Sequence, residues 1–370
     1  MSFFDIYKKY EDFDVQNFLN TVDPQTIQKA LNASNVSAFQ FLSLLSIKAE
    51  PLLEQMATRA HALTLQYFGK AIQLYTPMYV SNFCDNECIY CGFNRTNKIQ
   101  RKKLSFDEVD AEVQFISKTG LKHVLLLTGG SRTYSPVNYV KECVKILQKY
   151  FSSVSLEIYA LEVDEYKELI DAGVDGLTIY QEVYDKETYG QVHRSGPKAD
   201  YLFRLDAPER ALAVKMRTVN IGVLLGLSDW QREVFLLGLH AQYLQDKFFD
   251  SEISISLPRL RPAEGNFQPI CIVTDKNVVQ MILALRIFLP RLGITISTRE
   301  SSEFRENVLP LGVTRMSAGS TTQVGGHTAI ADENNKISQF EISDKRNVSE
   351  IIEFLHQKGY QPVLKDWMAI

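Results

Sequence analysis

Cys84-Asp85-Asn86-Glu87-Cys88-Ile89-Tyr90-Cys91 is the stretch from which the fold and chemistry of this 370-residue chain can be worked out. Its cysteines have the spacing C-x-x-x-C-x-x-C and follow the apolar, β-rich run 72–80. Thiolates this close together indicate a ligand set, and soft sulfur donors select zinc, copper(I) or iron–sulfur clusters. A structural zinc site needs four protein ligands, and neither His61 nor His123 has a finger-like spacing to the cysteines. The pattern therefore favours a four-iron cluster over zinc, with one iron left free to bind a small molecule.

Size and composition are those of an ordinary globular protein with an ample core, because 45% of the residues are hydrophobic and 23% are charged. A chain of this length fits one large domain or two small ones, and α/β barrels of this size occur as single units. The net charge of −4 gives no whole-protein attraction to nucleic acid or anionic lipid, so neither partner is expected. The basic run from Arg95 to Lys103 is interpreted as a solvated loop or helix start rather than an anion-docking patch.

Cysteine usage and the absence of targeting patterns predict a cytoplasmic protein. Residues 1–5 contain no basic region followed by an apolar core, and no uninterrupted apolar segment is long enough to span a bilayer. Five cysteines, three of them clustered, do not make a disulfide framework. We therefore expect a reducing cytoplasm, where thiolates stay available for metal. Cys143 falls on an apolar helical stripe and is interpreted as a core residue, whereas Cys271 is given no role.

The order of the predicted elements points to a barrel. Residues 1–70 have helical periodicity without a strand pattern, which predicts a helical extension packed on the main domain. Strands then alternate with helices, the predicted strands being 72–80, 123–128, 155–160, 176–181, 218–225, 252–257, 293–297 and 313–317. This alternation predicts an α/β protein with a parallel sheet, either closed or open. The count favours a (β/α)8 TIM-type barrel over residues 71–318, with residues 319–370 as a C-terminal cap. In such a barrel the chemistry lies at the carboxyl ends of the strands, where the cysteine loop begins.

Polar residues at the first strand ends are candidates for the site. The turn Thr128-Gly129-Gly130 allows close approach of the backbone to a ligand, although an ordinary βα turn has the same pattern. Glu157 lies in the third strand, where an unpaired carboxylate is costly, so we expect it to contact a ligand or to be paired in the core. Gln181 ends the fourth strand. Arg204 opens the next helical region, where a surface ion pair and a ligand contact are equally expected.

Arginines mark the ends of the later strands. Arg259 and Arg261 follow the sixth strand, Arg299 follows the seventh, and Ser317 ends the eighth. An arginine presents a planar fork that suits a carboxylate. Arg299 is best placed to bind the carboxylate of an amino-acid substrate, with the Ser317 hydroxyl holding the same group. Arg299 is equally able to pair with Glu300 or another core carboxylate.

With Tyr90 directly before the third cysteine, the motif resembles the radical S-adenosylmethionine (SAM) signature, which has an aromatic residue at that place. The motif alone identifies only the superfamily. Further blocks resemble the 2-iminoacetate synthase family, the tyrosine lyases of thiamine biosynthesis within the aromatic amino-acid lyase branch. These blocks are residues 68–69, 75–77, 90–93, 97–101, 225–230, 258–262, 297–301 and 365–367.

The resemblance implies cofactors and an activity. Cys84, Cys88 and Cys91 would hold a [4Fe–4S] cluster whose fourth iron chelates SAM. The residues implied to contact the cofactors are Tyr90, Gly92, Thr128, Gly129, Gly130, Glu157, Gln181 and Arg204, and those implied to contact the substrate are Arg299, Ser317 and Arg259. Reductive cleavage of SAM would start the cleavage of tyrosine at Cα–Cβ, giving 2-iminoacetate (dehydroglycine) and p-cresol, with 5′-deoxyadenosine and methionine.

The resemblance also implies partners and leaves alternatives. The implied partners are L-tyrosine, a thiazole synthase that receives the dehydroglycine, and a reductase or flavodoxin-type electron donor. The same branch contains tryptophan-processing and deazaflavin-pathway enzymes. It also contains a tyrosine lyase of hydrogenase maturation with further cysteines in a C-terminal extension, whereas the last cysteine here is Cys271. The alternative from another class is a non-catalytic, metal-bearing subunit of a thiazole-forming complex, which would need only the cysteines.

Overall fold

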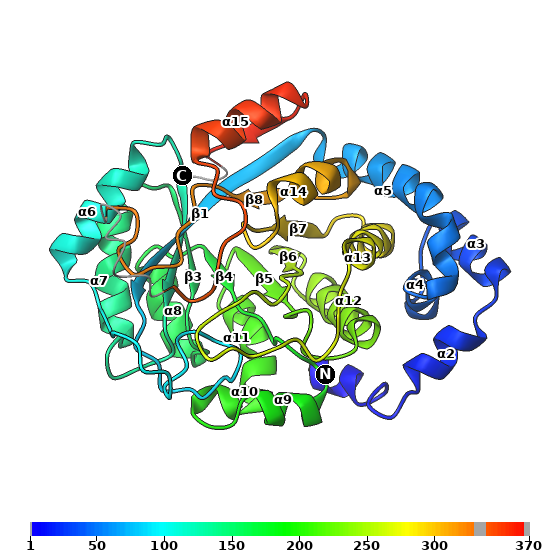
Figure 1. The fold of residues 1–370 in the computed structure, drawn as a ribbon, viewed down its shortest axis with the longest axis horizontal. Helices are drawn as coiled ribbons and strands as arrows, with labels where there is room; N and C mark the ends of the chain where they lie inside the picture. The colour runs from blue at the N-terminus through cyan, green and yellow to red at the C-terminus, as the bar shows by residue number, and fades with distance from the viewer. Residues whose placement is uncertain (1, 329–337, 366–370) are drawn as a thin grey trace.

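The computed structural model describes residues 2–328 and 338–365, and its centre is a closed barrel of eight parallel strands (Figure 1). The strands are β1 (Ala71–Ser81), β2 (His123–Thr128), β3 (Ser153–Glu157), β4 (Gly176–Thr178), β5 (Thr218–Gly222), β6 (Glu252–Ser256), β7 (Gly293–Ile296) and β8 (Arg315–Ser317). Neighbours pair in chain order, and β1 pairs with both β2 and β8, which closes the barrel. The predicted TIM-type barrel is confirmed. β3, β4 and β5 each end three residues before their predicted ends.

Helices surround the strands because each carries one apolar stripe. They are α6 (Phe106–Ser117), α7 (Val137–Leu147), α8 (Val163–Asp171), α9 (Lys186–Val192), α10 (Tyr201–Leu205), α11 (Ala207–Ala213), α12 (Trp230–Lys247), α13 (Asp275–Phe288) and α14 (Ser302–Val308). In α6 the capping box of Ser105 and Glu108 satisfies the first backbone amides, and the stripe led by Val109 and Val113 is buried. Cys143 is fully buried on α7, as expected for a core residue.

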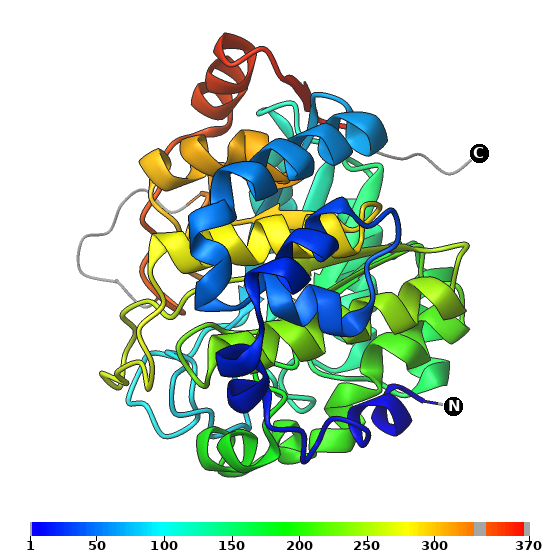
Figure 2. The same cartoon turned by 90° about the vertical axis from the view of Figure 1, so that its right-hand side faces the viewer.

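The first 70 residues form a layer of helices over one side of the barrel (Figure 2). This layer contains α1 (Phe3–Tyr7), α2 (Val15–Thr21), α3 (Pro24–Asn32), α4 (Ala38–Leu44), the 3₁₀ turn Ile47–Leu52 and α5 (Leu53–Phe68). The Phe41 ring of α4 stacks on the Phe288 ring of α13 with 4.4 Å between centroids. A Cβ at Gly238 of α12 would lie 2.4 Å from the Phe41 ring, so the glycine permits this close packing. These helices therefore pack on α12 and α13, on the outside of the barrel.

After β8 the chain crosses the barrel mouth, forms α15 (Val348–Gln357) and ends its described part with β9 (Gln361–Val363). β9 is a ninth parallel strand that pairs with Ala71–Gln73 of β1, and the sequence analysis did not predict it. Parts of the expected cap, residues 329–337 and 366–370, lie outside the described residues, as do Asp366 and Trp367 of the block 365–367. No helix in the described part of the chain is long and apolar enough to cross a membrane.

Candidate active site

Two adjoining hollows occupy the carboxyl ends of the strands. The outer chamber, of about 1330 Å³ with its open mouth included, lies beside the cysteine loop. The inner chamber, of about 840 Å³ counted in the same way, extends into the barrel. The residues that line both chambers are Tyr79, Leu127, Glu157, Tyr180, Pro258, Arg299 and Phe340. This arrangement can hold a cofactor above and a small substrate below, with the reacting groups meeting at the shared wall.

Cys84, Cys88 and Cys91 all line the outer chamber. Their loop leaves β1 and is held by backbone hydrogen bonds, with Asp85 N–H donating to the Gly130 carbonyl at 3.1 Å and Glu87 N–H to the Ser195 carbonyl at 2.9 Å. Burial raises the pKa of the Cys88 thiol to about 12, so a bound metal must displace its proton.

The donor set of the outer chamber suits a polynuclear cluster. Cys84, Cys88 and Cys91 are free thiols that line the same space, and soft sulfur ligands select zinc, copper(I) or iron–sulfur clusters. A structural zinc site would need a fourth protein ligand. In a four-iron cluster each thiolate binds a different iron, which spreads the sulfurs around a common space. The three thiols and the chamber they face therefore fit the predicted [4Fe–4S] cluster.

The turn after β2 packs against the cysteine loop. A Cβ at Gly129 would lie 2.2 Å from the Phe83 carbonyl oxygen, and one at Gly130 would lie 2.3 Å from Asn86 Nδ2. The Gly130 carbonyl accepts hydrogen bonds from Asp85 N–H and from Asn86 Nδ2 at 3.3 Å. The two glycines thus let this turn pack closely against the cysteine loop. The Gly130 carbonyl is already occupied by hydrogen bonds from that loop. The Thr128 hydroxyl in the same wall is buried and has no hydrogen-bond partner among the described residues.

Tyr90 is fixed at the chamber wall by a histidine that the sequence analysis left without a role. Its hydroxyl lies 2.8 Å from His193 Nε2, and His193 Nδ1 lies 3.0 Å from the Tyr189 carbonyl oxygen. Burial holds the pKa of His193 well below its ordinary value, so the ring is neutral. Nδ1–H therefore donates a hydrogen bond to the Tyr189 carbonyl, and Nε2 accepts a hydrogen bond from the Tyr90 hydroxyl. Lys198, which follows His193 in the loop after α9, forms a largely buried ion pair with Glu182 at 2.7 Å.

Glu157 stands between the two chambers. Burial, and secondly the charge of Glu182, raises the pKa of its carboxyl to about 7, against the opposing effect of Arg299 and Arg204. Arg204 is buried in the outer wall, where its Nε donates to the Tyr180 carbonyl at 2.9 Å. It is therefore no surface ion pair, and its guanidinium faces the same space as Glu157.

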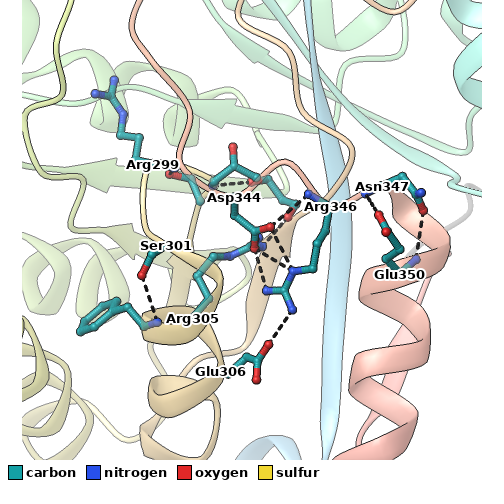
Figure 3. Close-up of polar contacts among 12 residues, drawn as sticks. Arg299, Ser301, Arg305, Glu306, Asp344, Arg346, Asn347 and Glu350 are labelled. Atoms are coloured by element: carbon teal, nitrogen blue, oxygen red, sulfur yellow. Dashed lines mark hydrogen bonds and ion pairs between the residues drawn. The ribbon is translucent and has the colours of Figure 1, made fainter.

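Arg299 lines both chambers and lacks a carboxylate partner within the described residues. Its guanidinium lies over the Phe340 ring, 3.3 Å from the centroid, and it points away from the polar cluster around Asp344 (Figure 3). Glu300 does not pair with it, because this carboxylate is held by Arg259 and Arg261. Ser317 lines the inner chamber, and its hydroxyl accepts a hydrogen bond from Thr298 N–H at 3.1 Å.

Three expected contacts are not placed in the chambers. Arg259 lies outside both linings because its guanidinium binds Glu300 and, at 2.6 Å, Asp275, so it supports the end of β7 instead of facing the cavity. Gln181 is buried and lines neither chamber, and its Nε2 and Oε1 have no hydrogen-bond partner among the described residues. Gly92 lies behind the wall, where a Cβ would be 2.5 Å from the Gln339 carbonyl oxygen.

The structure also brings to the chambers residues that the sequence patterns did not single out. They are Tyr79, Lys198, Gln339 and Phe340. Tyr180 and Glu182 also line the outer chamber, on either side of Gln181, but β4 ends at Thr178 and Glu182 has a φ of 71°, so strand alternation does not relate their side chains. Gln339 and Phe340 come from an irregular segment without periodicity, so the sequence alone offered no signal for them.

Comparisons with known proteins agree with this geometry. Residues 78–237 match the model of the Radical SAM superfamily, and residues 256–361 match the Biotin and Thiamin Synthesis associated domain. The chain is 36% identical to the 2-iminoacetate synthase of Salmonella typhimurium and 37% identical to that of Escherichia coli (strain K12), in each case over 99% of this chain and 97% of the relative. The crystal structure of HydG, a maturase of the [FeFe]-hydrogenase, superimposes with a TM-score of 0.88 at 33% identity, over 95% of this chain and 80% of that one.

Proposed function

The chain belongs to the 2-iminoacetate synthase family of radical SAM enzymes, and from that premise we propose that it cleaves the Cα–Cβ bond of L-tyrosine. The products are 2-iminoacetate and p-cresol, with 5′-deoxyadenosine and methionine, and the 2-iminoacetate supplies the thiazole moiety of thiamine. The observation that carries this proposal is the pair of adjoining chambers. Three thiols line the outer one, and the shared wall holds an arginine with no carboxylate partner among the described residues.

Cys84, Cys88 and Cys91 would hold the cluster, and the polar outer wall would hold SAM. Together these groups supply one electron and a radical able to abstract a hydrogen atom. Thr128 offers its unpartnered hydroxyl there, and Glu157 and Arg204 offer opposite charges on the same side of the chamber. Tyr90, held by His193, closes the wall beside the third thiol. Gly129 and Gly130 allow the turn after β2 to pack against the cysteine loop. Gly92 leaves room for the backbone of Gln339 beside that loop.

Arg299 is the residue that would fix the substrate. Its guanidinium is stacked on Phe340 and has no carboxylate partner among the described residues, so it can form a two-pronged contact with the carboxylate of tyrosine. The Ser317 hydroxyl, from the inner chamber, would hold the same group. Such a contact places the amino nitrogen at the shared wall. A displacement of about 1 Å there would cost on the order of a hundredfold in rate.

The test is an anaerobic turnover assay with reconstituted protein, SAM, a chemical reductant and either tyrosine or tryptophan. Tyrosine-dependent formation of 5′-deoxyadenosine, p-cresol and glyoxylate, the hydrolysis product of 2-iminoacetate, supports the proposal. Tryptophan-dependent products would keep the reaction class and replace the substrate. A protein with a full cluster that does not cleave SAM would favour the non-catalytic alternative.

The electron donor would dock on a cationic face around the cysteine loop. Arg95 N–H donates to the Asn86 carbonyl, and Arg194 N–H donates to the Glu87 carbonyl, each at 3.0 Å, so both exposed arginines sit against this loop. Residues 84–103 and 191–198 together carry five exposed Lys or Arg residues and no exposed acidic residue, in a chain of net charge −4; the five are Arg95, Lys98, Lys102, Lys103 and Arg194. An acidic, flavodoxin-type protein would be steered to such a face. The basic run is a loop, as expected, but its position beside the thiols supports this second role.

A charge-reversal variant distinguishes weaker docking of the electron donor from a slower reaction in the active site. The double variant Lys98→Glu/Arg194→Glu should slow turnover with an acidic protein donor and weaken its salt dependence, because exposed charges act by screened attraction. Turnover with dithionite should not change. Lys29→Glu, which reverses one exposed charge on α3, is the control. Equal slowing with both reductants would contradict the docking proposal.

Delivery of the product also requires a partner. An imine such as 2-iminoacetate hydrolyses readily in water, so we propose direct transfer to a thiazole synthase in a reducing cytoplasm. Mixing the two purified proteins should raise the yield of thiazole product over that from 2-iminoacetate released into buffer. No association and no effect on yield would contradict direct transfer.

A further inference from the structure

One peptide of the C-terminal segment lies against both the cysteine loop and the substrate arginine. Gly92 N–H donates to the Gln339 carbonyl at 3.2 Å, and Gln339 N–H donates to the Thr322 carbonyl at 3.2 Å. The next residue, Phe340, packs under the guanidinium of Arg299. The backbone of Gln339 is therefore fixed from two sides, directly beside Cys91.

The side-chain amide of Gln339 lies between the Tyr79 hydroxyl and the sulfur of Cys91, with its nitrogen toward the sulfur. This orientation suits a metal-bound thiolate, which can only accept hydrogen bonds. The Tyr79 hydroxyl, from β1, lies 2.7 Å from Gln339 Oε1 and donates to it, because an amide oxygen can only accept. With the oxygen turned toward Tyr79, the nitrogen Nε2 faces the sulfur of Cys91 at 3.8 Å. Tyr79 in turn is buried and packs edge-on against the Phe93 ring with 5.9 Å between centroids. The chain Tyr79–Gln339–Cys91 thus ends with an N–H group directed at a cluster ligand.

We propose that Gln339 donates a hydrogen bond to the Cys91 thiolate and thereby raises the reduction potential of the cluster, with Tyr79 as the positioning residue for its amide. Reduction adds negative charge, part of which resides on the ligand sulfurs. An N–H directed at one of them stabilises the reduced state more than the oxidised one. This inference rests on the proposed function, since it concerns the cluster that the three cysteines would hold.

The experiment is an EPR-monitored redox titration of the reconstituted protein without tyrosine. Gln339→Met removes the donor at similar side-chain length. We expect its equilibrium constant for one-electron reduction to fall about tenfold, which is a midpoint potential about 59 mV more negative. Tyr79→Phe should shift the potential in the same direction by less, because the amide remains but is no longer oriented. Gln323→Met is the matched control, since Gln323 pairs through its backbone with Ser338 and contacts no cysteine sulfur.

A wild-type potential in Gln339→Met overturns the proposal, even if the melting temperature falls, because a purely structural role would not move the potential. Should this variant lose its cluster, Gln339→Glu replaces it. The change keeps an acceptor for Tyr79 and turns an oxygen toward the sulfur, so it must lower the potential, and an unchanged potential is again refuting. The readout does not depend on which amino acid is cleaved. Failure of tyrosine turnover with a shifted potential would refute the proposed substrate alone.

Discussion

Asp344→Asn tests how the C-terminal segment is held over the chambers. Asp344 and Arg305 form an ion pair whose side chains are 1% and 0% exposed. Arg305 also donates to the Ser317 carbonyl of β8, and Arg346 joins Asp344 to Glu306 of α14 (Figure 3). The variant leaves the buried Arg305 charge without its counterion. Because Asp344 lies four residues after Phe340, the same change loosens the peptide that reaches the site.

The expected loss of stability in Asp344→Asn follows from the burial of the Asp344–Arg305 ion pair. Removing one partner of a buried ion pair costs about 3–5 kcal/mol, and we expect about 3 kcal/mol because the new amide oxygen still accepts a hydrogen bond. An unfolding entropy of about 2.1 cal/mol/K per residue over this length moves the melting temperature by roughly 1.3 °C per kcal/mol, which gives a fall of about 4 °C.

The pH dependence of this loss has a definite sign. Burial alone would raise the pKa of Asp344, but the hydrogen bonds from Arg346 and the charge of Arg305 outweigh it and leave the pKa below its ordinary value. A carboxyl with a lowered pKa contributes stability above its unfolded pKa, about 3.9, and loses it as the pH falls through the folded value. The difference between wild type and variant should therefore shrink below roughly pH 4.

Thermal melts of the protein without cofactors measure this effect. Asp171→Asn is the matched control, because its ion pair with Lys167 is more than 60% exposed on both sides and should contribute little. A melting temperature of Asp344→Asn that equals that of wild type at pH 7 would refute the argument. So would an equal fall in both variants.

Three further predictions concern the chambers, and a fourth concerns Arg259, which lies outside them. Cys88→Ala should abolish cluster loading and SAM cleavage while the fold persists by circular dichroism; loss of folding would favour a structural metal instead. Arg299→Lys should lower kcat/KM for tyrosine roughly 10- to 100-fold, because one charged hydrogen bond is worth about 1.5–3 kcal/mol. Arg259→Lys should instead lower stability, because it loosens Glu300. Glu157 has a carboxyl pKa raised to about 7, so the cofactor-free protein should lose stability as the pH rises from 4.5 through 7. Glu157→Gln should flatten that part of the melting profile, and an unchanged profile would contradict the assignment.

Local patterns made much of the fold predictable. The eight barrel strands and the cysteine loop follow from strand–helix alternation and one dense motif, and Arg299 followed from its place after β7. β9 escaped prediction because three residues carry too little pattern to identify a strand. Gln181 was predicted to contact the cofactor but lines neither chamber, because the strand ends at Thr178 and periodicity no longer fixes the direction of the side chains that follow. Gln339 reaches Cys91 from 248 residues along the chain, a distance over which single-sequence periodicity carries no information.

That long-range contact bears on when the site can be completed during synthesis. A ribosome releases the cysteine loop long before Gln339, and before β9 can pair with the first residues of β1. Until those segments emerge, the thiols lie beside an open chamber, on a loop that follows a strand with part of one edge unpaired. Synthesis from the N-terminus therefore produces the cysteine ligands early and the segments that cover them late. We expect iron and sulfide to enter a finished chain released from the ribosome, not a nascent one.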